Sequence, residues 1–133
     1  MTKEDKELLM RDLSCRIPYG VIVNVYGMSN VKLTSVSWYG EVSVNDGSTY
    51  LYPISEVKPY LFPLSSMTEE QKKEYNILCG DVPTYHYEFG DIVEDTILYD
   101  NWESIDYLNA HHFDYRGLIE KGLAIDATGL NIY

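Results

Sequence analysis

The side chains in this sequence that are best suited to acid–base or metal chemistry are its three histidines, one of which has a carboxylate two residues away. His86 and Glu88 lie in an alternating stretch that predicts a β-strand, so both side chains would point to one face. There they could supply two metal ligands, or a general base and its orienting carboxylate. The His-x-Glu spacing also occurs in zinc deaminases, but the PCxxC sequence of that site does not follow. A solvated strand face explains the pair better, and we expect no catalytic residue, no metal and no cofactor.

The other two histidines, His111 and His112, are adjacent in a segment with helical periodicity. Neighbouring helical positions are about 100° apart, so a regular helix cannot turn both rings toward one metal ion. We place His112 on the apolar side of this helix, with Trp102 and Phe113 as core residues, and His111 on the exposed side. A small hydrolase that uses His86 or His112 is the third function to consider.

Acidic side chains crowd the stretch from residue 81 to residue 106. Their spacing misses the D-x-D/N-x-D/N-G loop that binds calcium, so the run predicts either a solvated face or a mimic of phosphate charge. No phosphate-binding GxxxxGKS/T or GxGxxG loop and no GxSxG turn occurs in the sequence. Cys15 and Cys79 form no CxxC pair and are expected to be reduced thiols. The acidic residues of the candidate surface are Asp91, Glu94, Asp95 and Glu103.

The net charge of −11 is concentrated in one half of the chain. Residues 1–73 carry 8 basic and 9 acidic side chains, whereas residues 74–133 carry 2 basic and 12 acidic ones. Nucleic acids and anionic membranes attract proteins through lysine and arginine. We therefore expect no direct binding to nucleic acid and no membrane association, and we expect the partner to be a protein.

Tyrosine is unusually frequent, with 13 residues against 3 phenylalanines and 2 tryptophans. Tyrosine suits half-buried sheet surfaces, where the ring packs and the hydroxyl stays hydrated. The same rigid, amphipathic ring also suits recognition surfaces, because it gives contact area at a low cost in conformational entropy. Tyr39 and Tyr50 are the tyrosines that we assign to a candidate interaction surface.

Local patterns predict the elements of the first half. Thr2 can cap an amphipathic helix over residues 1–17. From residue 19 to residue 63 the hydrophobic period is two, which predicts four strands in a meander with turns at Met28–Asn30 and Asn45–Ser48. A one-turn link and a short fifth strand complete the chain order of a small SH3-like β-barrel.

The second half predicts a mixed α/β appendage. Thr68 opens a capping box, a hairpin follows over residues 85–99, a third helix follows over residues 100–117, and a short strand ends the chain. The predicted fold class is α+β, with an N-terminal helix, the SH3-like barrel and an acidic C-terminal appendage, residues 64–133, packed on it. At 133 residues this is the size of a single domain, and without a secretory signal we expect it in the cytoplasm.

Several blocks of the sequence resemble a family of short, uncharacterised proteins of gut anaerobic bacteria and their phages or mobile elements. The blocks cover about half of the chain. The family has no assigned activity, so the resemblance implies an origin but no catalytic residue, cofactor or partner. The blocks are Met1–Asp5 with Leu8 and Leu9, Ile17–Val21, Ile54–Leu61, Pro63–Glu70 and Tyr107–Ile119.

The leading functional hypothesis is a non-enzymatic protein-binding module of phage or mobile-element origin. It depends on the number of tyrosines, the acidic half and the lack of a catalytic motif. The alternative is an acidic, charge-mimicking inhibitor of a nucleic-acid-binding protein. The sequence leaves the partner and the oligomeric state open.

Overall fold

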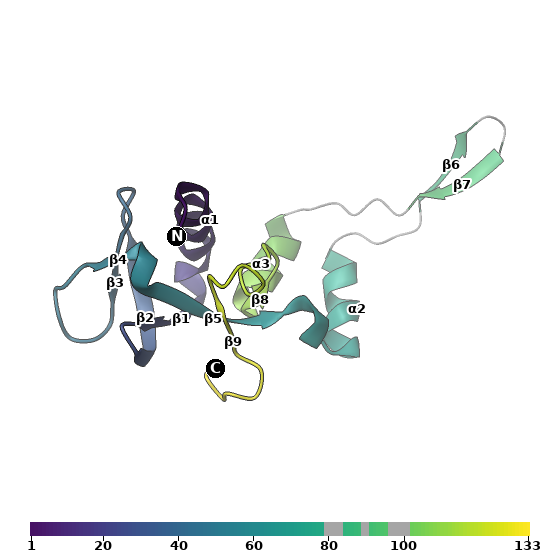
Figure 1. Cartoon of the computed structure of the whole chain (residues 1–133). Helices are drawn as coiled ribbons and strands as arrows, with labels where there is room; N and C mark the ends of the chain where they lie inside the picture. The colour runs from purple at the N-terminus through teal and green to yellow at the C-terminus, as the bar shows by residue number, and fades with distance from the viewer. Residues whose placement is uncertain (79–83, 89–90, 96–101) are drawn as a thin grey trace. The chain divides into compact units, whose positions relative to one another are not determined.

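The computed structural model describes residues 1–78, 84–88, 91–95 and 102–133, and it is a mixed α+β protein (Figure 1). The chain forms two compact units. The first combines Met1–Ser66 with Asn109–Tyr133, and the second is Met67–Leu108. Segments from both ends of the sequence therefore share the first unit. No helix in the described ranges is long and apolar enough to cross a membrane.

The first unit begins with helix α1, Lys3–Arg16, which confirms the predicted N-terminal helix. The Thr2 hydroxyl accepts a hydrogen bond from the Asp5 amide at 3.1 Å, and the Asp5 carboxylate accepts one from the Thr2 amide at 3.4 Å. This reciprocal cap satisfies two amides that the first turn of a helix leaves unpaired. The 3₁₀ turn η1, Ile17–Tyr19, follows, and the chain leaves it through Gly20 at a φ of +71°.

The strands of the first unit form one sheet in the order β4-β3-β2-β1-β5-β8, with β9 also paired to β5 (Figure 1). Strands β1 to β5 pair antiparallel as a meander, whereas β8 and β9 both run parallel to β5. The bounds are β1 Ile22–Val25, β2 Met28–Val36, β3 Glu41–Val44, β4 Tyr52–Pro53, β5 Val57–Pro63, β8 Phe113–Asp114 and β9 Ile125–Asp126.

The sheet is open, so the closed SH3-like barrel predicted over residues 19–63 is not confirmed. Among the described strands, the two that end the sheet, β4 and β8, do not pair with each other. The free edge of β5 pairs instead with β8 and β9, which come from the C-terminal part of the chain. The meander and the 3₁₀ turn η2, Ile54–Glu56, between β4 and β5 follow the predicted order.

The turn between β1 and β2 lies two residues earlier than predicted. Tyr26 and Gly27 have φ values of +49° and +82°, and two successive positive values are what a type I′ turn requires. Met28 already belongs to β2, so the turn predicted at Met28–Asn30 is wrong.

The chain between β3 and β4 is a loop over residues 45–51 and not a tight hairpin. Asp46 holds this loop, because its carboxylate accepts hydrogen bonds from the Ser48 amide at 3.0 Å and from the Tyr52 hydroxyl. Tyr52 and Pro53 are the whole of β4, which is shorter than the strand predicted there.

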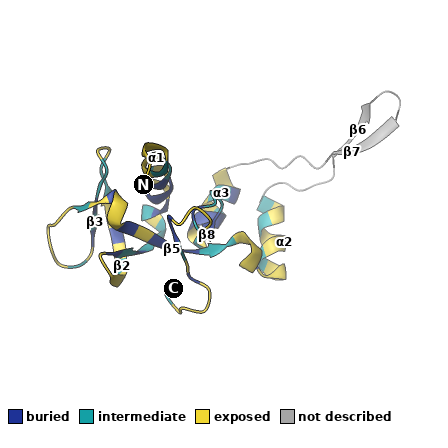
Figure 2. Ribbon diagram, viewed as in Figure 1, coloured by how far each residue is buried: buried dark blue, intermediate teal, exposed yellow. Residues whose placement is uncertain are grey.

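The core of the first unit is aliphatic. The buried face of the sheet and helix α1 supply most of it, as the dark blue segments of Figure 2 show. Strands β1 and β3 each alternate half-buried and buried residues, as expected of strands with one face in the core. The buried members include Leu9, Leu13, Val21, Val23, Val25, Leu33, Val42, Val44, Val57, Leu61, Leu118 and Leu123.

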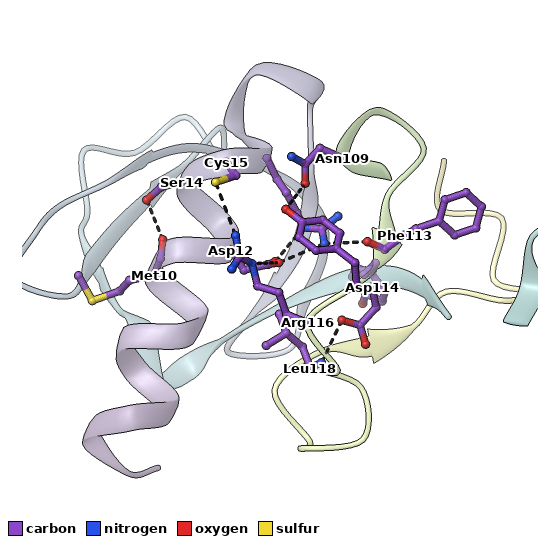
Figure 3. Close-up of polar contacts among 12 residues, drawn as sticks. Met10, Asp12, Ser14, Cys15, Asn109, Phe113, Asp114, Arg116 and Leu118 are labelled. Carbon is purple, nitrogen blue, oxygen red and sulfur yellow. Dashed lines mark hydrogen bonds and ion pairs between the residues drawn. The ribbon is translucent and has the colours of Figure 1, made fainter. Parts of the chain in front are cut away.

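One ion pair is buried beside this core. Asp12 and Arg16 of α1 have no solvent exposure, and the Arg16 Nε and Nη2 groups donate to the two carboxylate oxygens at 2.7 and 3.1 Å. The same Nη2 donates to the Phe113 carbonyl at 2.7 Å, so the pair ties α1 to β8 (Figure 3). The Nε of Arg116 lies 3.3 Å from the Asp12 carboxylate, and both guanidinium groups lie 5.1 Å from the centre of the Tyr115 ring. We call these residues the Asp12 cluster.

The second unit contains α2, Glu69–Leu78, and the hairpin of β6, Thr84–Glu88, with β7, Asp91–Asp95. The predicted capping box is present, because the Thr68 amide donates to the Gln71 side chain at 2.9 Å and the Thr68 hydroxyl accepts from the Gln71 amide at 3.1 Å. Strands β6 and β7 confirm the predicted hairpin, whose turn lies outside the described residues.

Helix α3, Trp102–Ala110, is shorter than predicted. Leu108 and Phe113 are buried and His111 is exposed, as predicted. Trp102 is 79% exposed, so its prediction as a core residue is wrong. The helix ends at Ala110 because His112 takes a left-handed φ of +61°, whereas we expected it to continue to Gly117. Residue 100, where the helix was predicted to begin, lies outside the described residues.

The Asp12 cluster predicts that substituting Asp12 strongly destabilises the protein, although its place in the sequence resembles that of a surface residue. Asp12→Ala should lower the free energy of unfolding by about 3–5 kcal/mol, because it leaves two guanidinium groups without their carboxylate. Glu7→Ala, on the exposed side of the same helix, should change it by less than about 0.5 kcal/mol. Urea denaturation of both variants measures their free energies of unfolding. Equal losses in the two variants would contradict the stabilising role of the Asp12 cluster.

Candidate interaction surface

The turn between β2 and β3 presents two aromatic rings to solvent. Trp38 is 88% exposed and Tyr39 is 57% exposed. Their ring centres lie 5.6 Å apart with the planes at 89°, so the rings meet edge to face. We call Trp38 and Tyr39 the aromatic turn. Large, exposed apolar side chains in adjacent positions cost hydration free energy unless a partner covers them.

Hydrogen bonds on both sides hold the backbone of the aromatic turn. The Ser37 amide donates to the Glu41 carbonyl at 2.8 Å, and the Ser37 hydroxyl both donates to that carbonyl and accepts from the Glu41 amide, each at 3.0 Å. The Ile54 amide donates to the Gly40 carbonyl at 2.9 Å, which joins the turn to η2. Gly40 has a φ of +87°, a conformation in which a side chain is strained. The two rings are therefore exposed on a fixed backbone.

The aromatic turn forms one wall of a groove of about 390 Å³. Helix α1 and the segment from β4 to η2 form the rest of the groove. Lys6 and Glu41 place charges of opposite sign in this lining, and no ion pair or side-chain hydrogen bond of either group is seen in the described part of the chain. The groove is lined by Lys6, Met10, Trp38, Tyr39, Gly40, Glu41, Pro53, Ile54 and Ser55.

Tyr50, the second predicted tyrosine, lies in the loop between β3 and β4. It is 73% exposed, and the neighbouring Leu51 is 50% exposed. The Tyr50 amide donates to the Ser48 hydroxyl at 3.3 Å, so Asp46 and Ser48 order this loop together. Tyr39 and Tyr50 both belong to the first unit and both face solvent, and their role in binding stays a prediction.

The four predicted acidic residues belong to a different unit from these tyrosines. Asp91, Glu94 and Asp95 lie in β7, where only the backbone is described, and Glu103 is exposed in the first turn of α3. All four belong to the second unit. The predicted surface therefore draws its tyrosines from one unit and its acidic residues from the other.

The three histidines lie in two places in the chain, His86 in β6, and His111 and His112 directly after α3. His86 and Glu88 are alternate residues of β6, as predicted. The ring of His112 stacks on the ring of Tyr133, and its Nδ1 is buried without a hydrogen-bond partner. Burial, together with the positive charge of Arg16, lowers the pKa of His112 to about 4, so the imidazole is neutral at pH 7. No carboxylate among the described residues orients this ring as a general base would require.

Sequence reasoning missed Trp38, the most exposed aromatic residue of the aromatic turn. The signal was present, since Trp38 and Tyr39 stand directly before Gly40 at the end of a predicted strand. Adjacent residues of a strand point to opposite faces, so a strand would expose only one of the two rings. They are both exposed because they lie in the turn, beyond the last residue of β2.

A scan against models of protein families and searches of curated proteins and of solved structures found no match to this chain. The candidate surface is therefore defined by its own geometry.

The exposure of Trp38 predicts that this residue contributes little to folding. Trp38→Ala should change the free energy of unfolding by less than about 0.5 kcal/mol, whereas Leu33→Ala, at a core position of the same strand region, should lower it by about 2–5 kcal/mol. Leu33 is only 2% exposed. Chemical denaturation followed by circular dichroism compares them, and a large loss in Trp38→Ala would make the ring a structural element.

Proposed function

We propose that this chain is a non-enzymatic protein-binding module whose contact surface is centred on the aromatic turn. The observation that carries the proposal is the exposure of Trp38 and Tyr39 on a backbone that hydrogen bonds fix in place. The antiparallel order from β1 to β5, with the 3₁₀ turn η2 before β5, supports a relation to small SH3-like barrels. The fold alone does not determine the function.

In the free protein, hydrogen bonds already hold the backbone of the aromatic turn, so binding has less backbone freedom to remove. Tryptophan and tyrosine dominate the centres of protein interfaces because they bury a large area with few rotatable bonds. Fixing the turn before binding lowers the entropy cost of association further. The adjoining groove can take a side chain of the partner beside the two rings.

The two charged residues of the groove indicate which charges a matching segment of the partner would carry. Lys6 and Glu41 are both available for pairing, so the matching segment would carry one acidic and one basic group around an apolar or aromatic residue. The groove itself contributes no net charge to such a contact, because the charges of Lys6 and Glu41 cancel. Its affinity should therefore depend mainly on buried area.

The second candidate function, a mimic of nucleic-acid charge, has one observation in its favour. Residues 67–108, the second unit, hold 2 basic and 11 acidic residues, whereas the rest of the chain holds 8 and 10. Most of the net charge of the protein is therefore in one unit. A basic, nucleic-acid-binding partner would recognise that unit and not the aromatic turn. The phage or mobile-element origin stays a prediction.

Affinity capture of a partner, followed by binding measurements on variants, tests the proposal. The double variant Trp38→Ala, Tyr39→Ala should weaken binding at least tenfold, because aromatic residues at interface centres each contribute about 2 kcal/mol or more. Trp102→Ala is the matched control, since Trp102 is also largely exposed but lies in the second unit. Equal affinities for the double variant and the wild type would refute the proposal.

The salt dependence of the same affinity separates the two candidate functions. For binding at the aromatic turn, the dissociation constant should rise less than about tenfold between 0.1 and 0.5 M salt, because screening weakens only charge–charge contacts. For the charge mimic, the complex should be released by moderate salt and by competing DNA. In that case neutralising Glu94, Asp95 and Glu103 together would matter more than removing Trp38 and Tyr39.

A further inference from the structure

The side chain of Tyr133 reaches into the sheet of the first unit. Its hydroxyl accepts a hydrogen bond from the Ile22 amide at 3.0 Å and donates one to the Tyr60 carbonyl at 2.7 Å. Ile22 belongs to β1 and Tyr60 to β5. One hydroxyl group thus joins two neighbouring strands.

The pairing of the two strands explains why a hydroxyl fits there. Strand β1 pairs with β5 through Val23 with Pro59, Asn24 with Lys58 and Val25 with Val57, so Ile22 would face Tyr60 if the ladder went on. The β1–β5 pairing ends at Val23 and Pro59. The Tyr133 hydroxyl therefore takes the place of a direct bond between an amide and a carbonyl. It needs both a donor and an acceptor function there, which a phenol has.

Two further rings hold the ring of Tyr133. The centre of the His112 ring lies 3.6 Å away with the planes at 10°, and the ring of Phe62 lies 5.9 Å away at 51°. His112 takes the left-handed φ of +61° directly before β8. Tyr133 as a whole residue is 43% exposed, but desolvation of its hydroxyl raises the pKa of that group to about 12, so the hydroxyl stays protonated and able to donate. Together these groups recognise a flat ring that carries one hydroxyl.

Few other contacts hold the segment that carries Tyr133. The Ala127 amide donates to the Leu61 carbonyl, and the next backbone contact is the local bond from the Leu130 amide to the Ala127 carbonyl. Leu130 is 49% exposed, and Asn131 takes a positive φ of +53°. The hydrogen bonds of the Tyr133 hydroxyl to Ile22 and Tyr60 attach the end of this segment to the sheet.

We propose that Ile22, Tyr60, Phe62 and His112 form a phenol-binding site, and that Tyr133 is its releasable ligand. The site takes an aromatic ring with a hydroxyl group, supplied by Tyr133 or by a small phenol when Tyr133 is removed. This site is independent of the aromatic turn, because the two share no residue.

The charge state of His112 controls how firmly the site holds its ligand. The ring faces the guanidinium of Arg16 from α1, His111 of its own segment and the neutral phenol of Tyr133. With Tyr133 bound, the pKa of His112 is lowered from 6.5 to about 4, chiefly by burial. Release of Tyr133 opens the ring to water, so the released state binds a proton more readily. Acidification from about pH 6.5 toward pH 4 therefore favours release.

A small phenol tests the site in the variant Tyr133→Gly. In nuclear magnetic resonance titrations, p-cresol should shift the Ile22 amide and the His112 ring signals in a saturable way, while toluene, which lacks the hydroxyl, should not shift the Ile22 amide. The wild type should not respond, because Tyr133 fills the site. Tyr50→Gly, which removes an exposed tyrosine of the same unit, should behave like the wild type. Equal responses to p-cresol and toluene, or none in Tyr133→Gly, would overturn the proposal.

The variant Tyr133→Phe keeps the ring and tests the hydroxyl alone. The Ile22 amide should exchange with solvent about tenfold faster than in the wild type, because its hydrogen-bond acceptor is lost. In the wild type the same amide should lose protection as the pH falls from 7 to 5, after correction for the intrinsic exchange rate. His112→Gln should remove that pH dependence and His111→Gln should keep it. Unchanged exchange in Tyr133→Phe, or a pH dependence that survives in His112→Gln, would contradict the assigned roles.

Discussion

The carboxylate of Asp12 lies fully buried between the guanidinium groups of Arg16 and Arg116, and much of the first unit depends on this arrangement. Removing these charges from water is costly, and the cost is offset only where the geometry supplies enough hydrogen bonds and opposite charge. Two cations share one carboxylate, and the ring of Tyr115 provides further stabilisation through its face. Because Arg16 also binds the Phe113 carbonyl, the cluster holds β8 beside β5 and sets the position of the neighbouring His112.

The tyrosines serve two physical purposes, and the structure separates them. One group uses the hydroxyl to connect elements that are far apart in sequence, as Tyr133 does between β1 and β5 and Tyr107 does with Glu74 at 2.9 Å. The other group, including Tyr39 and Tyr50, leaves most of the ring in solvent. The composition thus reflects both a structural and a surface role.

Most of the net charge lies in the second unit, whereas the aromatic turn lies in the first. The first unit is nearly neutral and carries the aromatic turn and the proposed phenol-binding site, while the second unit holds most of the negative charge. We expect the affinity of a partner for the first unit to depend on buried area and on shape complementarity. The charge of the second unit acts over longer distances, where it can speed or slow the approach of charged partners.

Local chemistry determined the elements that the sequence predicts correctly. Thr2 and Thr68 cap their helices through residues three positions away, and the period of two in β1 and β3 follows from the geometry of a single strand. Only the tertiary structure decided that Asp12 and Arg16, spaced like a surface ion pair, are buried, and that Trp102, spaced like a core residue, is exposed. The physical reason is that burial depends on what packs against a residue. For Asp12 and Arg16 that neighbour is a segment about a hundred positions away, which no local pattern encodes.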